Sequence, residues 1–141
     1  RKSNALLIAC KDEGGNGLNK HEKALYSFSL LNHKLGQTPV LIINTKNLFR
    51  KKKHAHLISD LENFSPSGIA INPLTDHLFV ISAKGNTLIE FNKEGNILFI
   101  EKLPVHQFSQ PEGICFSPQG DLIISNEGKE GPGTILRFKA R

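Results

Sequence analysis

The sequence predicts an all-β fold, a β-propeller fragment of about two and a half four-stranded blades. Two observations carry this prediction. The apolar segments are short, rich in Ile, Val and Phe, and bounded by Gly, Pro, Asn and Asp. Their order also recurs along the chain with a period of about 45 residues, which is typical of one four-stranded blade. Helical repeats would need longer segments with a period of 3.6 residues.

The recurrence is clearest between two segments that share their landmarks. The first is FSPSGIAINPLTDHLFVISAKGNTLIEF, from Phe64 to Phe91, and the second is FSQPEGICFSPQGDLIISNEGKEGPGTILRF, from Phe108 to Phe138. Each contains a Gly with an apolar run, a Pro-containing turn, an apolar run that includes Ser, a Gly-bearing loop and a run that ends in Phe. The differences in length fall in turns, where insertions are tolerated.

Three partial units account for the chain when the strands of one unit are called a to d. The N-terminal part supplies strands b to d, because LLIACK matches FVISAK and PVLII matches ILFI. The predicted divisions are strands b–d in residues 1–43, a long connection in 44–66, strands a–d in 67–103 and strands a–c in 111–141. A closed ring needs roughly four to eight blades, so we expect the N-terminal half of the propeller to be missing and to act as a partner.

Composition argues against several classes of partner. The net charge is +5, but the basic run RKKK at 50–53 has no interleaved aromatic residues, so a solvated loop is favoured over a nucleic-acid site. No window approaches the roughly 20 apolar residues of a transmembrane helix. Cys10 and Cys115 lie in apolar runs, which favours buried thiols over a disulfide or a metal pair. His54 and His56 follow the basic run without further ligands at metal spacing, so we expect them in a loop as well.

Loop lengths separate the two ends of the predicted blades. Strand a lies nearest the channel and successive strands alternate in direction, so the b–c loops and d–a connections share one end. This end collects long loops such as CKDEGGNGLNKHEK, whereas the other end has short turns such as SPQG. Binding groups concentrate in long loops on a rigid scaffold. We call this end the long-loop face and expect the functional site there.

Charged and amide side chains are predicted to converge on the long-loop face. Glu112 begins a strand a, nearest the axis, whereas Lys11, Lys84 and Glu127 each follow a strand b, with Asn126 next to Glu127. Oxygen ligands of this kind suit Ca²⁺. The predicted metal ligands are Glu112, Asn126 and Glu127, and the further ligand-face candidates are Lys11 and Lys84. The alternative is that Glu112 only bonds backbone amides at its turn, and that Glu127 pairs with Lys84 or Lys129.

The segments LLIACK, PSGIAINPLTDHLFVIS and QPEGICFSPQGDLIISNEG resemble the SdiA-regulated family of bacterial propellers, which includes the YjiK-like proteins. The resemblance covers nearly the whole chain and aligns it with the family's C-terminal half. It implies an intact propeller of five or six blades in a periplasmic, secreted or membrane-anchored extracytoplasmic location. Lactonase-like and NHL-type propellers carry similar Gly-Ile and turn motifs.

Likeness to calcium-dependent propeller hydrolases would carry a metal role only onto the three residues already named. The matching residues of the preceding blade are Ser67, Ala83 and Lys84. A catalytic metal needs several protein oxygens and an open position, and this chain offers few. We therefore expect a non-enzymatic binding or scaffold propeller that presents the long-loop face to a small molecule or an envelope protein. The alternative is a metal-dependent hydrolase of lactones or phosphate esters.

Overall fold

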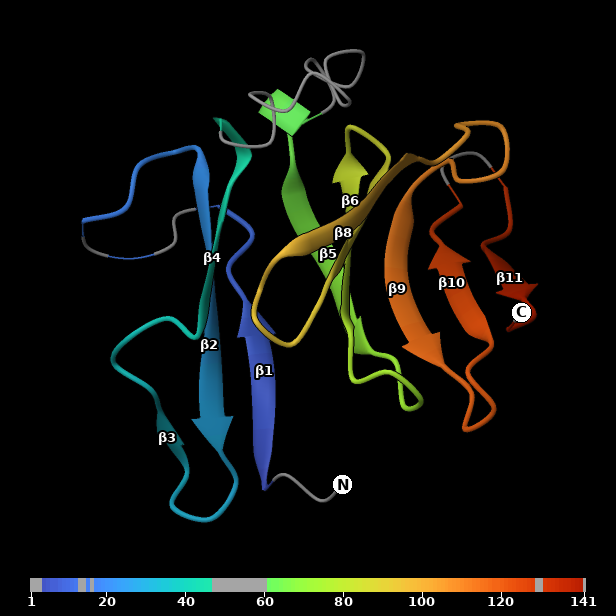
Figure 1. Ribbon diagram of the computed structural model, residues 1–141. Coiled ribbons are helices and arrows are strands. Elements are labelled where there is room, and N and C mark those ends of the chain that lie inside the picture. Colours follow the sequence, from blue (N-terminus) through green and yellow to red (C-terminus); the bar gives the residue numbers. More distant parts are fainter. Residues whose placement is uncertain (1–3, 13–14, 16, 47–60, 129–130, 141) are drawn as a thin grey trace.

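The computed structural model describes residues 4–12, 15, 17–46, 61–128 and 131–140. In this part of the chain, eleven strands form three separate antiparallel sheets, which stand side by side (Figure 1). The first two sheets have four strands each and the third has three. This is the all-β propeller fragment that the sequence predicts. The basic run at 50–53, His54 and His56 lie outside the described residues, as does most of the predicted connection.

The first sheet contains strands b, c and d of the sequence prediction and one additional short strand. Its members are β1 (Ala5–Ala9), β2 (Glu22–Ser29), β3 (Lys34–Leu35) and β4 (Leu41–Asn44). β2 pairs with β1 along one edge, and with both β4 and β3 along the other. The unpredicted β3 forms because His33 adopts a φ of 55°, which folds the polar c–d loop back on β2.

The second and third sheets follow the predicted strand order. The second contains β5 (Ser65–Ile71), β6 (Leu78–Lys84), β7 (Thr87–Phe91) and β8 (Ile97–Lys102), paired in that order. The third contains β9 (Pro111–Phe116), β10 (Leu122–Asn126) and β11 (Thr134–Phe138). Gly95 and Gly120 have φ values of 79° and 88°, which only glycine adopts easily, in the short turns at the end opposite the long-loop face.

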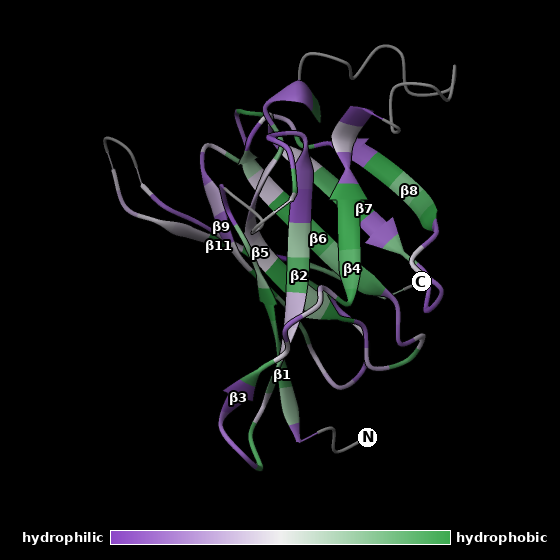
Figure 2. Cartoon of the chain, turned by 90° about the vertical axis from the view of Figure 1, so that its left-hand side faces the viewer, coloured by the Kyte–Doolittle hydropathy of each residue, from purple (hydrophilic) through white to green (hydrophobic). Residues whose placement is uncertain are grey.

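Two apolar layers hold the three sheets together. Leu25, Ile43 and Val80 belong to the layer between the first and second sheets, and Ile81 and Ile124 to the layer between the second and third. Neighbours along β6 thus serve different layers, because side chains alternate along a strand. This explains why the sequence shows near-continuous apolar runs, which appear as green stretches along several strands in Figure 2.

The inner strands of neighbouring sheets approach each other closely. β5 packs against β9, and a Cβ added to Gly68 would lie 3.1 Å from the backbone oxygen of Glu112 and 3.1 Å from Cγ2 of Ile114. A glycine is therefore needed where the two strands meet. Because β5 and β9 are the a strands of their sheets, this contact agrees with strand a being innermost, on which the assignment of the long-loop face depends.

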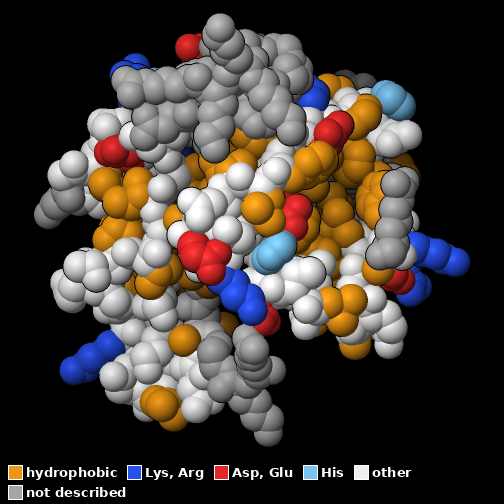
Figure 3. Space-filling model, viewed as in Figure 1, with side chains coloured by type: hydrophobic (Ala, Val, Ile, Leu, Met, Phe, Trp, Pro, Cys, Tyr) orange, Lys and Arg blue, Asp and Glu red, His pale blue; other side chains and the backbone are white. Residues whose placement is uncertain are grey.

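The outer faces of the first and third sheets are less covered. Hydrophobic side chains reach the surface in several places (Figure 3), and Ile135 of β11 is 75% exposed. The prediction of two buried thiols is wrong: both cysteines are free, Cys10 is half-buried and Cys115 is exposed. Cys115 follows Ile114, which packs toward the second sheet, so its own side chain points to the uncovered face. No helix in the described part of the chain is long and apolar enough to cross a membrane.

Asp121 forms hydrogen bonds with two residues that follow it in the chain, and these bonds make the stability of the fold depend on pH. One carboxylate oxygen accepts hydrogen bonds from Nε and Nη2 of Arg137, at 2.8 and 2.6 Å, and the other accepts one from the backbone N–H of Ala140 at 2.9 Å. The Ala140 amide and then the Arg137 guanidinium lower the pKa of Asp121. The unfolded chain, with the ordinary pKa of about 4, therefore takes up this proton more readily than the folded chain.

We expect Asp121→Asn to lower the melting temperature at pH 7. The difference from wild type should shrink as the pH falls below about 4, because the stabilisation is lost through the lowered pKa. Melting curves of both proteins between pH 7 and pH 2 test this, with Asp12→Asn as an exposed control. Parallel pH profiles for Asp121→Asn and wild type would contradict it.

Candidate functional site

A polar pocket opens on the long-loop face where the three sheets meet. Its volume is about 250 Å³, and we call it the long-loop pocket. The residues that line it are Lys11, Ser65, Ala83, Lys84, Asn86, Ser109, Gln110 and Glu112. Lys11 lies in the loop that follows β1 of the first sheet, Lys84 ends β6 of the second and Glu112 lies in β9 of the third. Three of the five predicted site residues therefore lie around one cavity.

A β-bulge places Glu112. On β10, Ser125 and Asn126 pair with Gly113 and Pro111, so Glu112 is an extra residue with no partner in the ladder. A bulge of this kind redirects the side chain of the extra residue. The consequence is that Glu112 lines the pocket rather than lying on a flat strand.

Ser67 is the extra residue at the matching place of β5, where the pairing skips from Pro66 to Gly68. Its hydroxyl donates to the backbone oxygen of Pro111 at 2.6 Å and accepts from the N–H of Ala83 at 3.1 Å. The same Pro-x-Gly motif therefore serves two purposes. In the second sheet it joins neighbouring blades, and in the third it presents a carboxylate.

Two buried serines fix the backbone of both lysines. The Ser65 hydroxyl donates to the carbonyl of Lys11 at 2.7 Å, and the Ser82 hydroxyl donates to the carbonyl of Lys84. The N–H of Ser65 in turn donates to Oγ of Ser82 at 2.9 Å. Both serines are at most 4% exposed, so these bonds are shielded from water. Sequence reasoning missed Ser65 and used Ser82 only as a landmark, although a polar residue in an apolar run was the available signal.

The ammonium groups of Lys11 and Lys84 are available to a ligand. Two other lysines on this face use theirs on the protein: Lys23 donates to the carbonyl of Asp12 at 2.9 Å, and Lys102 to that of Gly85 at 3.0 Å. Lys11 and Lys84 are exposed, and no described residue forms an ion pair with either. The alternative ion pair between Glu127 and Lys84 is therefore absent among the described residues; Lys129 lies outside them.

Gln110 connects the two predicted carboxylates. Its Nε2 donates to Oε2 of Glu127 at 2.7 Å and approaches Oε1 of Glu112 at 3.4 Å. The backbone N–H of Glu127 also donates to the carbonyl of Gln110 at 2.9 Å. The half-buried carboxylate of Glu112 thus receives only a long, weak hydrogen bond from Gln110, whereas the exposed carboxylate of Glu127 receives a short one. Sequence reasoning missed Gln110, because the role depends on a contact with the end of β10.

Asn126 does not line the long-loop pocket. It is 5% exposed, and its Nδ2 donates to Oγ1 of Thr134 at 3.2 Å. Its Oδ1 is buried and has no hydrogen-bond partner among the described residues. An unpaired buried amide oxygen is costly, so a donor or a cation at this point would stabilise the fold. Among the described residues, no three His, Cys, Asp or Glu side chains lie close enough together to hold a metal ion.

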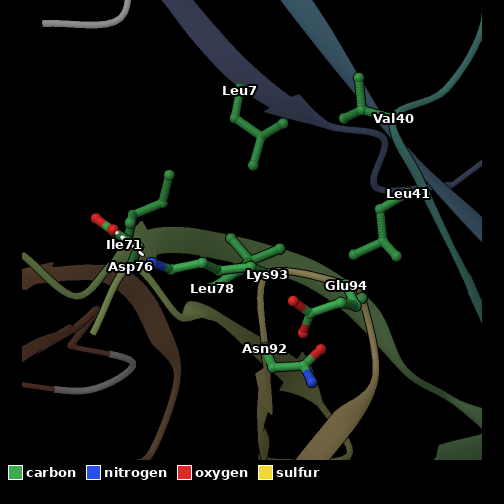
Figure 4. A pocket seen from close by; sticks show the side chains of 10 residues that line it. Leu7, Val40, Leu41, Ile71, Asp76, Leu78, Asn92, Lys93 and Glu94 are labelled. Carbon is green, nitrogen blue, oxygen red and sulfur yellow. Dashed lines mark ion pairs between the residues drawn. The ribbon is translucent and has the colours of Figure 1, made fainter. Parts of the chain in front are cut away.

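A second pocket, of about 280 Å³, lies at the opposite end between the first and second sheets (Figure 4). Leu7, Leu41 and Leu78 line it with apolar side chains. Its charged residues include Lys93 and Asp76, whose Nζ and Oδ2 form an ion pair at 2.9 Å. This ion pair leaves Glu94 as the remaining charged residue of a pocket with many apolar side chains, so the long-loop pocket is the stronger candidate for a polar ligand.

Comparisons with known proteins agree with the fold. A luciferin-regenerating enzyme of known structure superposes with a TM-score of 0.52 and 16% sequence identity, over 86% of this chain and 38% of its own length. At this identity the likeness shows the fold alone. No significant match was found among curated proteins. The family model described as SdiA-regulated matches residues 44–134, which include most of the long-loop pocket. The chain belongs to the SdiA-regulated family.

Proposed function

We propose that this chain is part of a non-enzymatic binding propeller whose long-loop pocket takes a small polar ligand. The observation that carries the proposal is the convergence of Lys11, Lys84 and Glu112, one from each sheet, on a single cavity. The backbones of both lysines are fixed by buried serines, while their ammonium groups have no partner among the described residues. Charged side chains that start from a fixed backbone and are not neutralised are suited to bind a ligand.

Binding is better supported than metal-dependent hydrolysis. A catalytic metal is usually held by about three protein ligands, with an open position for water or substrate. In the described part of the chain no three His, Cys, Asp or Glu side chains form such a group, so amide and carbonyl oxygens would have to complete it. Turnover of a lactone or phosphate ester that Glu112→Gln abolishes would nevertheless replace the binding function by the hydrolase.

A calcium ion at Glu112, Asn126 and Glu127 stays a prediction. The unpartnered Oδ1 of Asn126 supports it, since Ca²⁺ accepts amide as well as carboxylate oxygens. Backbone carbonyls and water would have to supply most of the shell, because only two carboxylates are near. Gln110 is the rival, as its amide already offsets part of the repulsion between them. The envelope location implied by the family likewise stays a prediction.

The function can be tested by the thermal melting of the whole chain with millimolar small anions, cations, zwitterions and calcium chloride. We expect at least one compound to raise the melting temperature of wild type and of Lys34→Ala, whose lysine lies in β3 away from the pocket. The rise should disappear in Lys84→Ala. A ligand at 100 times its dissociation constant stabilises the folded state by about 2.7 kcal/mol.

Equal shifts in Lys84→Ala and wild type, or no shift with any compound, would contradict the binding proposal. The calcium prediction is tested separately, by the melting temperature in the presence of calcium chloride. A calcium-dependent rise that Glu112→Gln removes would support the metal prediction, and no shift with millimolar calcium would reject it.

A further inference from the structure

We infer that the ligand of the long-loop pocket is a small zwitterion of the amino-acid class, with its carboxylate at Lys11 and Lys84 and its ammonium group at Glu112. The inference rests on the proposed function and names the chemistry of its ligand. Three observations carry it: the two unpartnered lysines, the weakly bonded carboxylate of Glu112, and the small volume of the cavity that they share.

The lysines define the anionic end of the ligand. Lys11 and Lys84 reach the same pocket from neighbouring sheets, and their backbone carbonyls are held by Ser65 and Ser82. Each ammonium group has three donors, none of which is used by a described residue. Charge-assisted hydrogen bonds to a carboxylate are roughly twice as strong as neutral ones. A carboxylate between the two ammonium groups would also relieve their mutual repulsion.

Glu112 defines the cationic end. Its carboxylate is half-buried, and its nearest donor among the described residues, Nε2 of Gln110, is 3.4 Å away. A partly buried charge is costly unless it is paired. Glu127 shares the same Gln110 amide and adds a second negative charge nearby. A ligand ammonium group at Glu112 would supply the missing donors and reduce the repulsion between the two carboxylates.

The charges and the size of the pocket select the ligand class. Two lysines and one glutamate line the pocket, so a ligand that carries both a negative and a positive group can pair with all three charges. A phosphate dianion would gain from the lysines but would be repelled by Glu112. Drug-sized ligands occupy pockets of about 300–1,000 Å³. The long-loop pocket, at about 250 Å³, therefore suits a single small metabolite.

The test compares L-alanine with acetate, methylammonium and inorganic phosphate as probes of the whole chain. Dissociation constants come from chemical-shift titrations of the ¹⁵N-labelled protein. We expect L-alanine to bind at least tenfold more tightly than acetate or methylammonium, because it engages both ends of the pocket. Glu112→Gln should weaken L-alanine binding about tenfold without weakening acetate binding, and Lys84→Ala should weaken both. Glu101→Gln, an exposed glutamate on β8, is the matched control.

The possible failures separate the two proposals. Acetate or phosphate binding that Lys84→Ala removes, without any preference for L-alanine, would overturn the zwitterion and leave the binding function intact. Unchanged L-alanine affinity in Glu112→Gln would also overturn it. Absence of binding by every probe would overturn the zwitterion and count against the proposed function.

Discussion

Replacement of Phe64 by Ala is expected to lower the free energy of unfolding by about 3–5 kcal/mol. Phe64 is 2% exposed and belongs to the apolar layer between the first and second sheets, immediately before β5. Truncation would leave a cavity that the rigid strands on both sides cannot close. A loss of this size is a large part of the 5–15 kcal/mol that stabilises a typical domain.

Urea unfolding of Phe64→Ala measures this effect, and Phe99→Ala is the matched control. Phe99 lies on β8 with 43% of its surface exposed, so its replacement should cost much less. Similar small losses for both variants would mean that the first two sheets are not packed through this layer. If Phe64→Ala is too unstable to purify, Phe64→Leu should show an intermediate loss.

The strands were predictable because their local signals agree with their packing. Residues 87–91, TLIEF, lie between a Gly-bearing loop and a turn, and β7 covers these residues without deviation. The buried b strands read as apolar runs because both of their faces are covered. β3 was missed because its two residues pair only after the polar loop has folded back. Cys115 was misjudged because exposure of an apolar residue depends on whether another sheet covers its face.

The site was predictable only as far as strand direction determines it. Lys11, Lys84 and Glu112 were placed at the same end of the sheets because each stands at the end of a predicted strand. The sequence could not show which polar groups are free to bind a ligand and which are already hydrogen-bonded within the protein. This difference depends on contacts between different sheets, such as the bond from Ser65 to the carbonyl of Lys11, which no local sequence pattern encodes.

Replacement of Ser82 by Ala is the second substitution with a large expected effect. Ser82 is 0% exposed, and its hydroxyl accepts from the N–H of Ser65 and donates to the carbonyl of Lys84. Alanine would remove both of these hydrogen bonds. A buried polar group that loses its hydrogen bond costs about 1–3 kcal/mol. We therefore expect a loss of stability of at least that size.

The same substitution should weaken ligand binding, because the backbone of Lys84 would no longer be fixed. Ser125→Ala is the matched control: this serine lies near the end of β10, as Ser82 does near the end of β6, and its hydroxyl forms no hydrogen bond with a described residue. Urea unfolding and L-alanine titration of both variants give the two readouts. Equal stability losses in the two variants would show that the hydrogen bonds of the Ser82 hydroxyl add no stability beyond that of an unbonded serine. Wild-type affinity in Ser82→Ala would show that the pocket does not depend on the fixed Lys84 backbone.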